Sequence, residues 1–320
     1  MFERIIVPLD GSRFAEAALA PARELARAFS SRILLVRAVP PHGLPSVIPG
    51  LSTANGDGRQ SEVERANDAD AYLHTVAEHL TQDGYDVDLA LALAAPGTAI
   101  AQAATLSHAD LIVMAAHLRW KVPASPDTSA ALDVLVHSRV PLLAWRVGAM
   151  EEAEGGPDVD HRPPLLARVE SPLLVALDGS PLAETALPVA ETLARAFGLY
   201  IVLVRAVSQP KEQAEAHQYL LRVQAELDQR GVAAISKTAT GDPLSVIENA
   251  WRENYGSLVM MTSRGRLGPH GTFFGSLAAR VLEEVEAPVL VLRPQQDAGS
   301  ADLHAASTES AAAEGGSAPM

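Results

Sequence analysis

The chain contains an internal repeat that covers most of its length. The segment VPLDGSRFAEAALAPARELARAF, which begins at Val7, returns as VALDGSPLAETALPVAETLARAF, which begins at Val175. Farther along, ADLIVMA (109–115) matches GSLVMMT (256–262). The spacing between the copies is shorter in this second match, by the length of the Pro- and Gly-rich segment 40–60 of the first copy. A repeat of this length predicts two domains with the same fold, which suits a chain of 320 residues.

Each copy shows the same alternation of short apolar runs with helix-like segments. The runs, rich in Val, Ile and Leu, predict strands. The expected strands are 5–9, 33–39, 87–93, 111–115 and 141–145 in the first copy, and 173–177, 200–207, 233–238, 258–261 and 288–292 in the second. The expected helices include 62–82, 129–137, 212–229 and 276–285, after a first helix that opens at Ser12 or Ser180 and contains Pro21 or Pro188. The composition of segment 40–60 predicts a mobile loop.

This alternation predicts an α/β fold of two tandem doubly wound domains. We expect each to be a five-stranded parallel sheet, in the order 3-2-1-4-5, with helices on both faces. In such sheets ligands bind at the carboxyl ends of the strands, where the strand order reverses. Asp10 and Asp178 follow the first strand of each copy, so both are expected at that edge. Arg37 and Arg205, near the ends of the second strands, either face a ligand, shape the crevice or are simply exposed.

The composition excludes several classes of function. A net charge of −14 argues against the broad basic face that nucleic acids require. The chain has no cysteine, so disulfides, thiolate metal sites and cysteine nucleophiles are impossible. The apolar stretch 89–101 is interrupted by Pro96 and Gly97 and is well below a membrane span. The N-terminal apolar run is too short for a signal-peptide core, and we expect a cytoplasmic protein. The histidines lack metal-binding spacing, so no dedicated metal site is expected.

The segment VMMTSRGRLGPHGTFFGS (259–276) is the strongest candidate for a binding site. It follows the predicted fourth strand of the second copy and carries four glycines before a helix expected at Ser276. Glycines let backbone amides approach a phosphate, and a helix N-terminus adds unpaired N–H donors and the positive end of its dipole. Arg264 can neutralise phosphate charge, and Asp178 can accept hydrogen bonds from a ribose. The alternative is a glycine-rich turn that binds nothing.

These residues resemble the universal stress protein family, with two such domains in one chain. The resemblance covers residues 1–294. ATP-binding members carry G-x2-G-x9-G-[S/T] after the fourth strand, and the second copy matches this motif from its second glycine onward, with Thr262 at the first position. The family's G-D-P opening before the third helix falls on 241–243. In such relatives the adenine lies against backbone near the end of the second strand. The resemblance therefore implies an ATP site, with Mg²⁺ arriving on the nucleotide, formed by Asp178, Ala206, Val207, Thr262, Arg264, Gly265, Gly268, Gly275 and Ser276.

The first copy departs from the motif. The aligned positions are Ala115, Leu118 and Thr128–Ser129, so every motif glycine is replaced. The resemblance then implies a first domain that keeps the fold and has lost the nucleotide. The expected organisation is a degenerate domain (1–147), an acidic linker (148–171), a nucleotide-binding domain (172–294) and a disordered tail (295–320).

Three functions fit this sequence. The first is a stress-response regulatory protein that binds ATP through its second domain. The second is a slow Mg-dependent ATPase, although no P-loop, nucleophile elbow or general base is evident, and we assign no catalytic residue. The third is a nucleotide-free interaction scaffold. The resemblance also implies an intramolecular pseudo-dimer in which the fifth strands pair across a two-fold axis, and two chains can dimerise further. The physiological partner and the inducing stress are not encoded in any recognisable motif.

Overall fold

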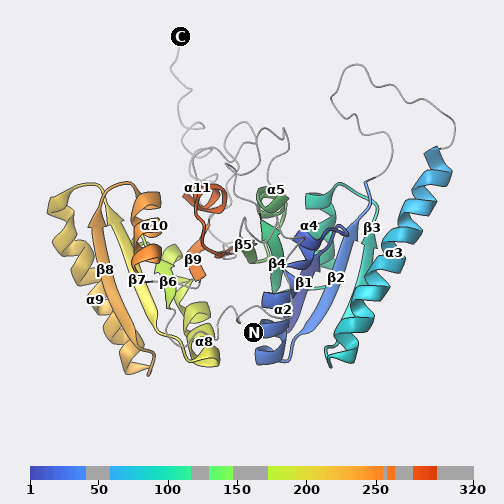
Figure 1. Cartoon of the computed structure of the whole chain (residues 1–320). Coiled ribbons are helices and arrows are strands. Elements are labelled where there is room, and N and C mark those ends of the chain that lie inside the picture. Colours follow the sequence, from blue (N-terminus) through green and yellow to red (C-terminus); the bar gives the residue numbers. More distant parts are fainter. Residues whose placement is uncertain (41–57, 117–129, 147–171, 255–257, 264–276, 294–320) are drawn as a thin grey trace, which may run out of the picture.

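Two similar α/β halves lie side by side, the first coloured blue to green and the second yellow to red in Figure 1. The computed structural model describes residues 1–40, 58–116, 130–146, 172–254, 258–263 and 277–293. The predicted linker and tail lie outside these residues, as do most of segment 40–60 and residues 264–276, which are called the glycine segment below. No helix in the described ranges combines the length and the apolar character needed to cross a membrane.

The strands and helices of the two halves correspond to one another. In the first half they are β1 (Arg4–Pro8), α1 (Arg13–Glu16), α2 (Leu19–Phe29), β2 (Arg32–Ala38), α3 (Gly58–Gln82), β3 (Val87–Ala92), α4 (Pro96–Leu106), β4 (Leu111–Ala116), α5 (Ala130–His137) and β5 (Leu142–Arg146). In the second half they are β6 (Leu173–Ala176), α7 (Pro181–Glu184), α8 (Leu187–Phe197), β7 (Ile201–Val207), the 3-10 turn η2 (Pro210–Glu212), α9 (Gln213–Gln229), β8 (Ala234–Thr240), α10 (Pro243–Glu253), β9 (Leu258–Thr262), α11 (Leu277–Glu284) and β10 (Val289–Leu292).

The predicted strand order is confirmed in both halves. The strands run β3-β2-β1-β4-β5 in the first half and β8-β7-β6-β9-β10 in the second, and all pairs within a half are parallel. The strand order reverses between β1 and β4, and between β6 and β9. The switch point that predicts a ligand crevice therefore occurs once in each half.

The fifth strands of the two halves join the sheets into one ten-stranded sheet. β5 pairs with β10 in the antiparallel direction, and Leu143 lies opposite Leu290 at the centre of the pair. These two leucines are equivalent in the repeat, because each is the third residue of the matching segments PLLAWR and PVLVLR. The register is therefore symmetric about the Leu143–Leu290 pair, as it is when two copies of one surface meet across a two-fold axis.

Alternating side chains of the strands feed two separate hydrophobic cores. Ile5 and Val7 of β1 belong to the core covered by α2, α3, α8 and α9, whereas Ile6 belongs to the core covered by α4, α5, α10 and α11. Each core continues from one half into the other. The sheet is therefore buried on both faces, which explains why its strands are almost continuously apolar.

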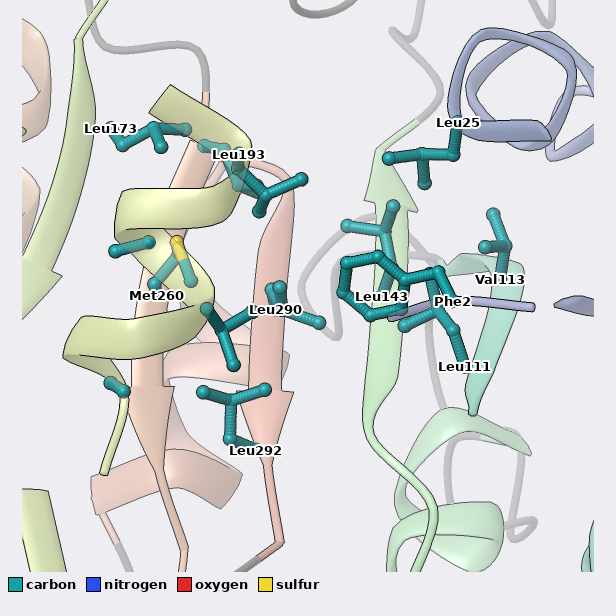
Figure 2. Close-up of a cluster of buried hydrophobic side chains, with 14 of the residues drawn as sticks. Phe2, Leu25, Leu111, Val113, Leu143, Leu173, Leu193, Met260, Leu290 and Leu292 are labelled. Atoms are coloured by element: carbon teal, nitrogen blue, oxygen red, sulfur yellow. The ribbon is translucent and has the colours of Figure 1, made fainter. Parts of the chain in front are cut away.

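Buried side chains from both halves meet at the junction. Leu143, Phe2 and Leu111 of the first half lie opposite Leu290 and Leu193 of the second (Figure 2), around a small apolar cavity. Phe2 is 2% exposed and packs edge-on against the Phe29 ring, which in turn contacts Phe197. Phe29 and Phe197 are again repeat equivalents. A chain of three aromatic rings, Phe2, Phe29 and Phe197, therefore crosses from the first half to the second.

The first predicted helix of each half, which was expected to contain Pro21 or Pro188, is divided into two helices. Ser12 and Ser180 cap short helices as expected, but α1 ends at Glu16 and α7 at Glu184 before a second helix begins. Pro21 has no N–H to donate to the carbonyl four residues earlier, and its ring crowds that carbonyl. Pro188 has the same effect in the second half.

The other differences from the predicted elements are small. Most strand ends shift by one residue, whereas β8 continues to Thr240, two residues beyond its predicted end. Helix α3 begins at Gly58, inside the segment 40–60 that was predicted as loop. Arg59 and Gln60 have high helix propensity, which favours a start of the helix before residue 62.

Candidate functional site

Three neighbouring strand ends of the second half form the predicted ligand edge. β6 lies between β7 and β9 and pairs with both. Asp178 follows β6 by two residues, Ala206 and Val207 end β7, and Thr262 ends β9. The structure brings these four predicted residues to one edge of the sheet. The remaining predicted contacts lie outside the described residues: Arg264, Gly265, Gly268, Gly275 and Ser276.

Asp178 is held at this edge by the turn that follows β6. The Ser180 N–H donates to Asp178 Oδ1 at 2.8 Å, and the Ser180 hydroxyl accepts the Ala183 N–H at 3.2 Å as the cap of α7. Gly179 between them has a φ of +88°, which favours glycine. The Asp178 side chain is exposed, and the turn engages Oδ1, so Oδ2 is the atom through which a ligand hydroxyl can be bound.

The end of β7 presents backbone groups at the same edge of the sheet. The Leu177 N–H donates to the Val204 carbonyl at 2.9 Å, and the Gly241 N–H donates to the Val207 carbonyl at 3.0 Å. Residues of a parallel ladder bond alternately to the two neighbouring strands. The backbone N–H and C=O of Val204 therefore point toward β6, and those of Val207 point toward β8. The N–H and C=O of Ala206 point to the β6 side, beyond the last residue that β6 pairs with β7, Ala176. A ligand at this edge can pair with both groups.

Arg205 connects the end of β7 to the turn beside Asp178. A Cβ placed on Gly179 would lie 2.8 Å from Arg205 Nη1 and 2.9 Å from Cζ, so the guanidinium packs directly on the glycine. The same guanidinium lies 5.0 Å from the centre of the Tyr219 ring on α9, within cation–π range. The sequence left open whether this arginine faces a ligand or shapes the crevice. In the structure its guanidinium packs on the turn that follows Asp178.

Tyr219 is itself held in a charged and partly buried environment. Burial, followed by the nearby Glu184 carboxylate, raises the pKa of the Tyr219 hydroxyl, which therefore stays protonated. Within the described ranges this hydroxyl is buried without a hydrogen-bond partner of good geometry. Glu184 accepts instead from Arg222 at 3.0 Å.

The first half contains the same set of residues. Gly11 has a φ of +86°, and a Cβ there would lie 3.2 Å from Arg37 Nη1. Arg37 lies 5.0 Å from the Tyr72 ring centre, and the Tyr72 hydroxyl donates to Glu16 at 2.8 Å. Burial is the largest cause that raises the pKa of Tyr72. The arginine and tyrosine were not predicted as a pair, although their recurrence in both copies was a signal that could have found them.

The predicted Gly241–Asp242–Pro243 opening has a structural role. Asp242 caps α10 and forms two bonds with Arg280 of α11, at 3.0 and 3.1 Å. Arg280 is the largest cause that lowers the pKa of the Asp242 carboxyl. Because Arg280 lies in the first turn of α11, which begins at Leu277, this ion pair links the starts of α10 and α11.

The corresponding edge of the first half carries bulkier side chains. Ala115 lies on β4 opposite Trp145 of β5, and Trp145 and Phe14 pack on Ala115 and Ala17. In the second half the equivalents of the two aromatic residues are leucines, Leu292 and Leu182. The aligned residues Leu118, Thr128 and Ser129 lie outside the described residues.

Within the described residues, no group of three or more His, Asp or Glu side chains is arranged to hold a metal ion. Two histidines pair with an aspartate one helical turn away, His74 with Asp70 and His137 with Asp133.

The fold and the repeat define a tandem doubly wound α/β protein, in which the strand order reverses once in each half. The universal stress protein family matches residues 1–146 and 171–293, and the chain belongs to this family. The prediction of two such domains in one chain is thereby confirmed.

Solved structures share this fold at low sequence identity. A universal stress protein from Archaeoglobus fulgidus DSM 4304 is 18% identical with a TM-score of 0.68, over 92% of this chain and 99% of that one. A protein from Pseudomonas aeruginosa UCBPP-PA14, described as a putative universal stress protein, is 17% identical with a TM-score of 0.61, over 92% of this chain and 94% of that one. Comparison with curated proteins gives no match.

Proposed function

We propose that the second half binds ATP or a related adenine nucleotide, and that occupancy regulates the protein in a stress response. The observation that carries this proposal is the meeting of Asp178, Ala206 and Thr262 on three adjacent strand ends, directly before the glycine segment. Each residue suits a different part of a nucleotide, and the order of the strands matches the order of those parts.

The chemistry of the three positions supports an adenine nucleotide. The Ala206 N–H and C=O form a donor–acceptor pair on a strand end, which complements the Watson–Crick edge of adenine. Asp178 Oδ2 is a carboxylate acceptor for ribose hydroxyls. Thr262 leads into Gly265, Gly268 and Gly275, whose backbone amides suit phosphate oxygens, and the start of α11 adds a positive dipole end. Mg²⁺ would enter with the triphosphate.

The difference between the halves supports a single nucleotide per chain. The first half retains Asp10 and the end of β2, but its motif glycines are replaced, and Trp145 and Phe14 crowd the end of β4. We propose that this half serves as a structural partner. The symmetric pairing of β5 with β10 supports an intramolecular pseudo-dimer. Further association of two chains and a cytoplasmic location stay predictions.

Calorimetry with Mg–ATP tests the proposal. The wild-type chain should bind a single nucleotide, Asp178→Ala should weaken binding, and Gly275→Val should abolish it by placing a branched side chain where phosphate must approach. Asp10→Ala is the matched control in the first half and should leave binding unchanged.

The outcomes separate the candidate functions. Nucleotide released from purified protein by denaturation, and identified by chromatography, would supply the ligand's identity. Absence of binding with and without Mg²⁺ would contradict the proposal and favour a scaffold. ADP that accumulates from ATP in the wild type and not in Gly275→Val would identify a slow ATPase.

A further inference from the structure

We infer that Arg205 is a positioning residue: it fixes the turn that presents Asp178 against the end of β7, and so sets the nucleoside end of the ligand site. The inference rests on the proposed nucleotide site for its ligand and on the described contacts for its geometry. Arg205 itself binds no ligand in this assignment.

The turn after β6 cannot hold its conformation through side-chain packing of its own. Gly179 has no side chain, and its φ of +88° belongs to a region that glycine enters and leaves freely. The guanidinium of Arg205 supplies the missing contact, since its Nη1 and Cζ lie against the place where a Cβ would be. The Arg205 guanidinium therefore provides the packing contact that a side chain at position 179 would otherwise make.

The guanidinium is fixed on its other contacts as well. The Tyr219 ring lies 5.0 Å from Cζ and comes from α9, which packs on β7 and β8. Arg205 is paired through its backbone with Thr238 of β8, so its Cα belongs to the rigid sheet. Arg205 is thus held at its backbone by the sheet and at its guanidinium by the Tyr219 ring. The turn packs against this guanidinium.

The position of Arg205 gives this anchoring a consequence for binding. Arg205 immediately precedes Ala206, whose backbone faces the crevice, and it touches Gly179, which immediately follows Asp178. The Arg205 side chain therefore links the Ala206 backbone, which is assigned to the base, to Asp178, which is assigned to the ribose. In this proposal Arg205 takes no part in binding the phosphates.

The first half provides a matched control. Arg37, Gly11 and Tyr72 repeat the arrangement, with the same 5.0 Å from guanidinium to ring, in a half that is not proposed to bind nucleotide. Substitution of Arg37 removes an equivalent charge and an equivalent packing contact. Any loss caused by Arg205→Met and not by Arg37→Met then concerns the site and not general stability.

The test compares the wild type, Arg205→Met, Arg205→Lys and Arg37→Met by calorimetry with Mg–ATP and with inorganic tripolyphosphate. We expect Arg205→Met to weaken ATP binding about tenfold and to leave tripolyphosphate binding unchanged, because only the base and ribose contacts are disturbed. Arg205→Lys should not restore ATP affinity, since an ammonium cannot pack flat between glycine and tyrosine. Arg37→Met should bind both ligands like the wild type.

A second measurement does not depend on nucleotide. Hydrogen exchange at the Ser180 amide, which bonds to Asp178 in the turn, should accelerate in Arg205→Met and stay unchanged in Arg37→Met. Unchanged exchange and ATP affinity in folded Arg205→Met would overturn the inference, as would equal losses in Arg37→Met. If the wild type binds no ATP, the proposed function fails, and the Ser180 exchange alone decides whether Arg205 orders the turn.

Discussion

The Arg146 guanidinium, at the end of β5, donates to the carbonyl oxygen of Leu282 near the end of α11 in the other half. Arg293, after β10, donates in turn to the carbonyl of Leu135 near the end of α5. Arg146 and Arg293 occupy equivalent positions of the repeat, and so do Leu135 and Leu282. The two contacts are therefore one contact made twice, which is the mark of a two-fold interface between two copies of the same surface.

These arginines place positive charge at the negative ends of two helix dipoles. Burial lowers the pKa of Arg146 to about 10, so the side chain is still a cation at neutral pH and must be stabilised by acceptors. The carbonyls near the end of a helix have no partner within the helix, and each half thus supplies what the other lacks.

The first prediction concerns the two contacts by which Arg146 and Arg293 each bond to a helix of the other half. Arg293→Met should lower the free energy of unfolding by about 1.5–3 kcal/mol, the range for a hydrogen bond to a charged group. Arg146→Met should do the same, and the losses should add within about 0.5 kcal/mol because the two contacts are separate. Urea unfolding followed by circular dichroism measures both.

Arg252→Met is the control, since Arg252 forms an exposed ion pair with Glu248, and it should cost less than about 1 kcal/mol. A loss from Arg293→Met no larger than that of the control would show that the exchanged contacts do not hold the halves together.

The second prediction concerns the centre of the junction. Leu143→Ala should destabilise the chain by about 2–5 kcal/mol, because Leu143 is 2% exposed and borders a gap that its loss would enlarge. Leu106→Ala removes the same atoms from a side chain that is 82% exposed and should change stability by less than about 0.5 kcal/mol. Thermal unfolding compares the two variants, and similar values would mean that the junction is not a true core.

The repeat and the apolar runs were sufficient to predict the sheet order, because burial on both faces leaves a continuous hydrophobic signal in each strand. The sequence showed where Pro21 lies within the first helix. It did not show that the clash between the proline ring and the carbonyl four residues earlier would divide that helix in two. The early start of α3 was missed because Gly58, a poor helix former, closes the Gly-containing run 50–58, which is typical of a loop.

The candidate site was predictable in part, for a different reason. Asp178 and Thr262 are far apart in the sequence, and only the strand order shows that they share an edge. The role of Arg205 depends on a glycine contact from another strand, which no local pattern reveals. The aromatic pair Trp145 and Phe14 was invisible for the same reason, since its members come from opposite ends of the first half.

The third prediction uses three glycines of positive φ to separate backbone strain from contact. Gly231→Ala has nothing within 4 Å of the new Cβ and should cost only the strain, about 1–2 kcal/mol. Gly11→Ala, with Arg37 at 3.2 Å, should cost more, and Gly179→Ala, with Arg205 at 2.8 Å, should cost most. Chemical unfolding of the three variants gives the order, and equal losses would show that the guanidinium moves aside freely.

The last prediction concerns acid stability at the start of α10. Arg280 holds the pKa of the Asp242 carboxyl below its ordinary value of 3.8, so the folded state favours the ionised form. A carboxyl whose folded pKa is depressed stabilises the protein fully above the unfolded pKa and loses that contribution as pH falls through the folded pKa. The wild type should therefore exceed Asp242→Asn in melting temperature at neutral pH, and the difference should shrink as the pH drops below about 4.

Asp83→Asn is a useful control, because Asp83 pairs with Arg23 far from the edge that carries the candidate site. A gap between wild type and Asp242→Asn that stays constant from neutral to acidic pH would show that the cap acts through its shape and not through its charge.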